Sequence, residues 1–444
     1  MFKKISWVNL YLILTAIINP LLAFAQPDLL IISVFLEFII LFTQKDNKIF
    51  NLWKIFILSS IYFGVSILGI KLYDIVLIII VLSSLLGTLK SKMKLKKSIF
   101  IKHIEIYYFI IYLTCILIYQ NSNSQEFMEY TRYIMSFLIV IIFAYSNLSV
   151  EYVKKLIKFT PVVAVKNFIS GVLIFILSNV KGHELSTNSS WMNFKTHYNQ
   201  GELRLVGFYS DPNKYYLFFI VTFLLIEMYK NALNTKLEHE KIIKTFLIVG
   251  IISSFSRTAI IIVILLVFTE ILKLFIPQKF QKLKVVFYWL LALLFFLSID
   301  ILMEFMNKLL YNLTIVMGRE SSLIYSSSIE ESSRIIASKI ALGSIKQNMF
   351  FGNGFFTWNE LYYMPPHNTF IFILQDIGIV GLLLYFICIM SIRYYLRIEI
   401  IIALLILPSI TLDLQNFRLL YFVLALSIFF RYENESVNNL RRRQ

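Results

Sequence analysis

Apolar runs long enough to cross a lipid bilayer recur along almost the whole chain, and they restrict its possible folds more than any other feature. The hydrocarbon interior of a bilayer cannot hydrogen-bond exposed backbone groups, so segments of this kind cross it as helices. Only 15% of the residues are charged, against about 25% in an average soluble domain. We therefore predict an all-α, polytopic membrane protein.

The chain has a formal net charge of +16, and its lysines cluster in short loops between the apolar runs. The strongest cluster has five lysines between residues 90 and 97. Short cytoplasmic loops of membrane proteins carry such an excess of basic residues. The charge is thus explained without a nucleic-acid partner, and we expect none.

The alternation of basic and polar loops predicts a bundle of about 14 transmembrane helices, within a range of about 12–14. The expected spans are 5–25, 28–44, 52–70, 73–89, 104–120, 132–147, 160–180, 205–229, 242–256, 258–275, 285–303, 368–390, 399–412 and 418–430. The first run also resembles a cleavable signal, but we interpret it as a retained helix because further spans follow. Both termini are then cytoplasmic.

On this basis the chain divides into four parts. Residues 1–180 form N-terminal transmembrane helices, and residues 181–303 form transmembrane helices that carry arginine motifs. Residues 304–367 form a long extracytoplasmic loop or lid, and residues 368–444 form C-terminal transmembrane helices with a basic cytoplasmic tail.

The extracytoplasmic loop is expected to be partly folded. Ser327-x-x-Glu330 is a capping-box pattern, and apolar residues that include Ile336, Ile340 and Ile345 follow at helical spacing. The pattern predicts an amphipathic helix that ends before Gly352 and lies on the membrane surface or over a cavity. A packed lid with no further role is the alternative.

Three arginines map to the outer side: Arg204, Arg257 and Arg334. Arg204 and Arg257 lie at span ends, where the charge rule for loops would not place them. A guanidinium group carries a permanent charge and a fork of donors that matches phosphate oxygens. Three such groups near one another would suit a pyrophosphate. Contact with lipid headgroups is the alternative for each of them.

A histidine and an aspartate mark the span at 368–390. His367 and Asn368 lie at its first turn, where the electropositive helix end disfavours a protonated ring and keeps it available as a base. A hydrogen-bonding histidine is the alternative. Asp376 lies inside this span. Glu37 and Lys166 lie inside two earlier spans, and charged residues within a span suggest a function. A neutral acid bonded across helices is the alternative for Asp376.

A series of short motifs lies between residues 204 and 381. These motifs are Arg204-x-x-Gly207, Asp211-Pro212-Asn213, Ser254-x-Ser256-Arg257, Ser333-Arg334, Gly352-x-Gly354, His367-Asn368-Thr369-Phe370 and Asp376-x-Gly378-x-x-Gly381. Their order and spacing, with the long outer segment before the histidine, resemble the family of O-antigen ligases and Wzy-type polysaccharide polymerases. The N-terminal half resembles that family only as a set of spans.

The resemblance implies glycan transfer from a polyprenyl-pyrophosphate carrier at the outer membrane face, with inversion at the sugar C1 and without a metal or other cofactor. Arg204 and Arg257 would bind the pyrophosphate and stabilise its leaving charge, and Arg334 would assist. His367 would act as the base on the acceptor hydroxyl, or orient it. The other candidate substrate-binding residues are Asp211, Asn213, Asn368 and Asp376, the last standing where the family often has glutamate.

Within this resemblance we favour a polymerase of capsule, exopolysaccharide or O-antigen in the bacterial cytoplasmic membrane. A ligase would need a lipid A core acceptor and hence an outer membrane, whereas the Lys-, Ile-, Asn- and Phe-rich composition suits an AT-rich genome. A lipid-linked oligosaccharide flippase and a purely structural membrane protein are the alternatives from other classes. The partners expected are carrier-linked donor and acceptor, membrane lipids, a flippase and a chain-length regulator.

Overall fold

The computed structural model describes residues 6–91, 104–120, 124–146, 148–182, 185–188, 192–195, 204–209, 211–275, 333–362, 366, 368–390, 395–396, 398–412, 414 and 417–441. The elements of the N-terminal half are α1 (Trp7–Ala25), α2 (Pro27–Phe42), α3 (Lys48–Ser59), the 3-10 turn η1 (Ser60–Tyr62), β1 (Ser66–Ile67), β2 (Ile70–Lys71), α4 (Leu72–Ser91), α6 (Ile104–Tyr119), α7 (Ser124–Tyr145), α8 (Val150–Lys181), β3 (Ser186–Asn188) and β4 (Met192–Lys195). Those of the C-terminal half are α9 (Pro212–Leu233), α10 (Glu240–Ile252), α11 (Arg257–Phe275), α15 (Ser333–Ile345), α16 (Thr357–Tyr362), α17 (Thr369–Met390), α18 (Ile398–Ile401), the π-helix η5 (Ile402–Ile406), α19 (Leu407–Thr411) and α20 (Arg418–Arg441).

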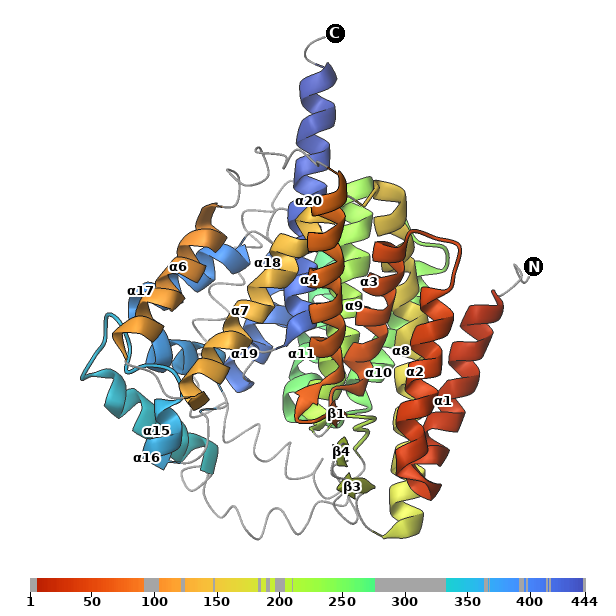
Figure 1. Ribbon diagram of the computed structural model, residues 1–444, viewed down its shortest axis with the longest axis horizontal. Coiled ribbons are helices and arrows are strands. Elements are labelled where there is room, and N and C mark those ends of the chain that lie inside the picture. The colour runs from red at the N-terminus through yellow and green to blue at the C-terminus, as the bar shows by residue number, and fades with distance from the viewer. Residues whose placement is uncertain are drawn as a thin grey trace.

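The long helices run side by side between two ends of the molecule (Figure 1). α1 packs against α2 and α8, α7 packs against α20, and α9 packs against α10. The short strands, α15 and α16 gather at the lower end of Figure 1, which we call the loop end. α20 ends at the opposite end, which we call the tail end. The architecture is all-α apart from these strands, as predicted.

Within the described ranges, four helices are long and apolar enough to cross a membrane: α1, α8, α9 and α17. Shorter apolar helices accompany them, including segments of α4, α6, α11 and α15. Every predicted span within the described residues overlaps a helix or a run of helices. The span at 285–303 and the first half of the long outer loop lie outside the described residues, so the count of about 14 spans stays a prediction.

The helices α7 and α8 begin at Ser124 and Val150, before the spans expected at 132–147 and 160–180, and two other predicted spans are longer than their helices. The span expected at 205–229 begins only at Pro212, because Asp211 caps α9 and the preceding residues 204–209 form a turn. The span expected at 52–70 ends at Tyr62, where the chain enters β1. In both places apolar residues continue beyond the helix and pack in the loop end, so hydropathy alone extended the span too far.

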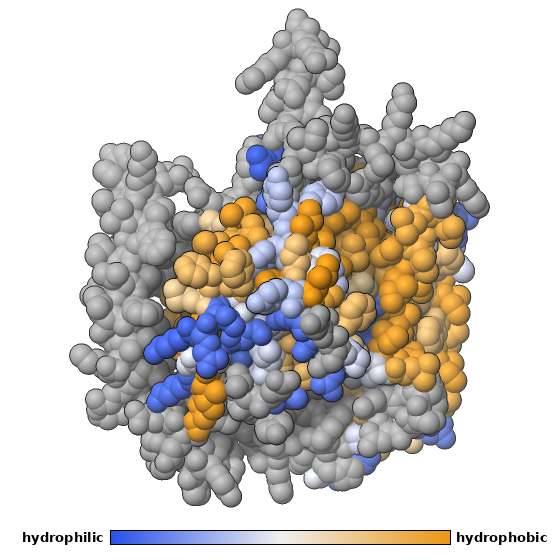
Figure 2. Space-filling view, turned by 60° about the vertical axis from the view of Figure 1, so that its left-hand side comes forward, coloured by the Kyte–Doolittle hydropathy of each residue, from blue (hydrophilic) through white to orange (hydrophobic). Residues whose placement is uncertain are grey.

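The outer flank of the helical body is apolar. α1 exposes Trp7, Leu10 and Leu14, and α2 exposes Ile32 and Ile39, each by at least half of its surface. Figure 2 shows hydrophobic surface over the flanks of the described body and hydrophilic surface gathered between and below them. A contiguous apolar belt of this kind faces lipid in a membrane protein. The composition and the surface therefore agree on a polytopic membrane protein.

A four-stranded antiparallel sheet in the order β2-β1-β4-β3 lies at the loop end, and it was not expected from the sequence. Leu68 and Gly69 both have positive φ (49° and 79°), which is the backbone of a two-residue hairpin turn between β1 and β2. Phe194 of β4 is buried against Phe208 at a centroid distance of 5.6 Å. The sheet thus packs on the turn at 204–209.

α17 is broken in its middle at Gly378, which has φ 68° and ψ −173°. Residues 349–354 form four backbone hydrogen bonds with residues 375–380, at 2.7–3.2 Å. Backbone groups freed by a break inside a membrane helix need such internal partners. The loop after α15 therefore completes the hydrogen bonding of α17, and both segments are fixed by the contact.

We expect Gly378→Ala to unfold this junction. A Cβ at residue 378 would lie 2.2 Å from the backbone oxygen of Phe350, in a conformation that L side chains rarely adopt. Strain and a backbone clash together should cost about 3 kcal/mol or more of unfolding free energy, measured by detergent-induced unfolding. Gly343→Ala in α15 is the matched control because its Cβ would meet nothing within 4 Å. Equal stability of the two variants would contradict the prediction.

The helix predicted in the outer loop is present as α15, and its buried face differs from the one expected. Ala337, Ala341 and Ile345 are buried, whereas Ile336 and Ile340 are 46% and 38% exposed. α15 packs on α17. Small residues at 337 and 341 allow this close approach, so Ile336 and Ile340 stay exposed while Ile345 is buried as expected.

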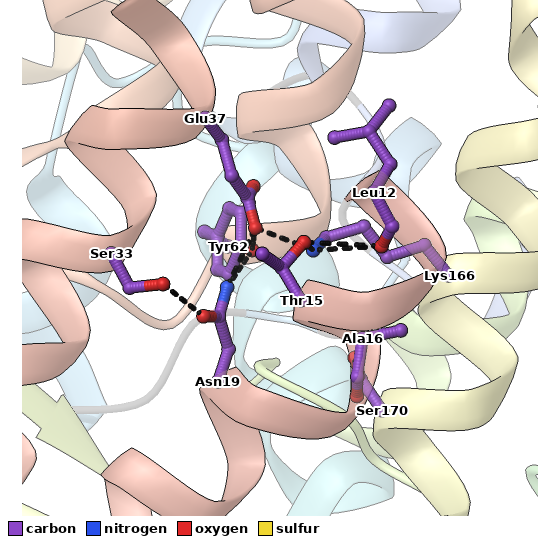
Figure 3. A network of polar contacts seen from close by, with 9 residues as sticks. All are labelled: Leu12, Thr15, Ala16, Asn19, Ser33, Glu37, Tyr62, Lys166 and Ser170. Atoms are coloured by element: carbon purple, nitrogen blue, oxygen red, sulfur yellow. Dashed lines mark hydrogen bonds and ion pairs between the residues drawn. The ribbon is translucent and has the colours of Figure 1, made fainter. Parts of the chain in front are cut away.

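A buried polar network joins the N-terminal helices (Figure 3). Lys166 of α8 donates to Glu37 of α2 at 2.6 Å and to Thr15 of α1 at 2.7 Å. Asn19 and Tyr62 also donate to Glu37, at 2.8 and 3.0 Å. Both charged side chains are 0% exposed. The two intramembrane charges left unassigned from the sequence are therefore partners of each other.

Candidate functional site

Arg204 is docked on the turn between α10 and α11. Its Nε donates to the carbonyl oxygen of Ser254 at 3.4 Å, and the backbone N–H of Leu205 donates to the carbonyl oxygen of Ser253 at 3.0 Å. These acceptors lie at the C-terminal end of α10, which is electronegative and attracts a cation. Arg204 thus bonds a carbonyl oxygen only three residues before Arg257, although Arg204 and Arg257 are far apart in the sequence.

The start of α9 is fixed to the same turn. The Ser256 hydroxyl donates to Asn213 Oδ1 at 2.6 Å, and both residues are buried. Asp211 caps α9 by accepting from the backbone N–H of Asn213 at 2.8 Å. Pro212 at the first helical position needs no hydrogen-bond partner for its nitrogen. The Asp-Pro-Asn motif therefore begins the helix and joins it to the Ser-x-Ser-Arg turn.

Gly207 has φ 59°, and a Cβ there would lie 3.2 Å from the Tyr215 ring and 3.3 Å from Asn167 Oδ1. The turn can follow its path only with glycine at this position. Phe255, in the facing turn, also has positive φ (44°). Two tight turns of this kind explain the spacing of Arg204-x-x-Gly207 and of Ser254-x-Ser256-Arg257.

Arg257 is the first residue of α11, directly after the turn that contacts Arg204. The first N–H groups of a helix have no partner within it and favour an anion. Arg334 is the second residue of α15. The structure describes the backbone but not the side chains of Arg257 and Arg334, and His367 lies outside the described residues. The proposed roles of these three side chains stay predictions.

The residues next to His367 are firmly held. Asn368 Oδ1 accepts from the backbone N–H groups of Phe370 and Ile371, at 2.9 and 3.1 Å, and so caps α17. Thr369 donates from its backbone N–H to Leu412 at 3.0 Å and accepts from Leu414 at 2.8 Å. The start of α17 is thereby fixed to the segment that leads into α20. The side-chain amide oxygen of Asn368 therefore has a structural role as the cap of α17.

Asp376 is fully buried beside the break in α17. Tyr133 of α7 donates to its Oδ2 at 3.2 Å, and Oδ1 has no hydrogen-bond partner among the described residues. Tyr112 of α6 donates to the carbonyl oxygen of Ile377 at 2.7 Å. Two aromatic hydroxyls therefore hold the broken stretch. Nothing in the sequence marks these tyrosines as special, since a tyrosine in an apolar run resembles any other core residue.

The site residues expected from the sequence form two groups in the described structure. Arg204 and Asn213 contact the turn before Arg257, and Asp211 caps α9 beside Asn213, whereas Asn368 and Asp376 lie along α17. In the searched part of the chain, no three His, Cys, Asp or Glu side chains gather in a way that could hold a metal ion.

The arrangement is that of a helical membrane protein whose arginine-bearing turns gather at one end of the bundle. Residues 242–386 match the family model described as O-Antigen ligase. This part of the chain is therefore an O-antigen ligase family domain, as the motifs indicated, and it includes the Ser-x-Ser-Arg turn, α15 and the broken helix α17. The chain matches no curated protein and no solved structure.

Proposed function

We propose that the protein is a polysaccharide polymerase that joins polyprenyl-pyrophosphate-linked repeat units at the outer face of the cytoplasmic membrane. The observation that carries the proposal is the docking of Arg204 on the turn before Arg257, in a chain with an O-antigen ligase family domain. Two permanent cations at one junction suit a diphosphate leaving group. Both termini would then lie in the cytoplasm, with the loop end outside.

The reaction is an inverting displacement. The acceptor hydroxyl oxygen forms a bond with C1 of the donor sugar while the bond from C1 to the diphosphate oxygen breaks, and the diphosphate leaves with the electron pair. His367 accepts the hydroxyl proton, and Arg204 and Arg257 stabilise the negative charge that develops on the leaving group. Arg334 assists from α15. We propose that this step needs no metal ion.

The remaining site residues have supporting roles in the proposal. Asp211 and Asn213 hold the arginine-bearing turns in place through the cap of α9 and the bond to Ser256. Asn368 fixes the start of α17 next to the proposed base. Asp376 stays bonded to Tyr133 and keeps the broken helix in register with the loop after α15.

A ligase that transfers the glycan to a different acceptor is the second candidate, and the description of the matched family favours it. Both reactions use the same donor and leaving group, so the arginine junction suits either. A flippase is a third possibility, because it would bind the same carrier-linked glycan. The acceptor distinguishes a polymerase from a ligase, and the side of the membrane on which substrate accumulates distinguishes both from a flippase.

A deletion strain tests the assignment. We expect carrier-linked single repeats to accumulate on the outer face of the membrane, because export continues while polymerisation stops. The measurement is labelling of lipid-linked sugar in intact cells and in lysed cells. Repeats confined to the inner leaflet would instead show a flippase, and would contradict a polymerase. Long chains that remain on the carrier would show a ligase.

A further inference from the structure

Two lysines face one aromatic ring at the loop end, outside the arginine junction. The Lys71 ammonium lies 5.7 Å from the centroid of the Phe63 ring, and the Lys214 ammonium lies 4.8 Å from it. Lys71 ends β2 and Lys214 lies in the first turn of α9. Elements from distant parts of the chain thus bring two positive charges to one place.

The ring that they face is held rigidly. Phe63 lies nearly parallel to Tyr73 and to Tyr209, at centroid distances of 5.3 and 5.9 Å and interplanar angles of 19° and 18°. All three aromatic residues are buried. The two lysines are each partly exposed, so their ammonium groups lie at the border between this stack and the surroundings.

Asp74 is the carboxylate near this pair in the part of the chain that the structure describes, and it is bound elsewhere. Within the described part of the chain, Lys71 and Lys214 form no ion pair, while the nearby Asp74 pairs with Arg418 at 3.0 Å. Burial, and then the charge of Lys214, lowers the pKa of Lys71, which Asp74 opposes only in part. A bound anion would relieve this repulsion.

One short segment connects the lysine pair to the proposed donor site. Residues 204–214 carry Arg204, whose Nε bonds the α10–α11 turn, and Tyr209, whose ring stacks on Phe63. Lys214 ends the same segment, one residue after Asn213 and its bond to Ser256. The segment that begins with Arg204 at the α10–α11 turn therefore ends with Lys214 at the Phe63 ring.

We infer that Lys71 and Lys214 bind the diphosphate of a second carrier-linked substrate, the acceptor, beside a first diphosphate at Arg204 and Arg257. The inference rests on the proposed polymerase, which must hold two carrier-linked glycans at once. It also separates a polymerase from a ligase, whose acceptor has no carrier diphosphate. Lipid headgroups carry phosphate as well, so the experiment distinguishes these two sources.

The test is calorimetric titration of the purified full-length protein in detergent with farnesyl diphosphate. Wild-type protein should bind two equivalents, and Lys71→Gln with Lys214→Gln should bind one, with the second weakened about 10- to 100-fold. Lys71→Arg with Lys214→Arg should keep both equivalents. Lys48→Gln is the matched control, because its ammonium lies 4.7 Å from the Phe42 ring and the residue begins α3, away from the proposed sites.

Two equivalents at unchanged affinity in the double glutamine variant would overturn the inference. Competition by phosphatidylglycerol as effective as that by farnesyl diphosphate would also overturn it, because the pair would then be a headgroup site. Circular dichroism of each variant checks folding. If Arg257→Ala left polymer synthesis intact, the polymerase proposal would fail, while loss of one equivalent in the lysine variant would still establish a diphosphate site.

Discussion

Cells that carry Arg257→Ala are expected to make no long-chain polysaccharide, while the variant protein still inserts at normal abundance. The first residue of α11 adjoins the turn on which Arg204 is docked, so its charge would act on the leaving diphosphate. Loss of one preorganised donor at a developing charge lowers turnover about 10²- to 10³-fold.

His367→Ala should lower turnover about 10²- to 10⁴-fold, as expected for loss of a base.

The measurement is polysaccharide chain length on a gel, with quantification of protein in isolated membranes. Arg257→Lys should recover only part of the activity, because an ammonium group cannot make the two parallel bonds of a guanidinium group. Lys241→Ala is the control: this exposed residue is in the first turn of α10, at the far end of that helix from the Arg204 junction. Normal chain lengths in the His367→Ala strain would refute the base assignment.

Lys166→Met is expected to destabilise the protein by about 3–5 kcal/mol. Lys166 and Glu37 are both 0% exposed, and the substitution leaves the carboxylate buried without its cation. Asn19 and Tyr62 still donate to Glu37, but neither supplies a positive charge. The free energy of detergent-induced unfolding measures the effect.

The double variant Glu37→Gln with Lys166→Gln should recover most of this loss, because removing both charges removes the uncompensated one. Lys154→Met on the same helix is the matched control. Lys154 pairs with Glu151 at 3.9 Å with both side chains substantially exposed, so its loss should cost less than about 1 kcal/mol. A similar cost for Lys154→Met and Lys166→Met would argue against the buried pair.

The helices could largely be predicted from the sequence because apolar length and loop charge report directly on membrane crossing. The strands could not. β1 and β2 are two residues each, and only Leu68-Gly69 hints at their turn. The break in α17 was equally hidden: a glycine within a span is typical of close helix packing, and the unusual backbone of Gly378 is explained only by residues 349–354 beside it.

The candidate site was predictable as a set of motifs and not as a set of contacts. The order of the motifs identified Arg204 and Arg257, but the bond from Arg204 to Ser254 depends on how α9 and α10 pack. The Lys166–Glu37 pair is hidden for the same reason, since its partners lie on different helices. Long-range contacts of this kind leave no periodic trace in one sequence.

Purified protein reconstituted into lipid bilayers, with a single polyprenyl-diphosphate-linked repeat unit as its only glycan, tests the central claim most directly. The account predicts a ladder of carrier-linked oligomers and release of one polyprenyl diphosphate for each new linkage, and neither should form with Arg257→Ala. Transfer that requires a different acceptor, or movement of the repeat unit across the bilayer without any new linkage, would contradict it.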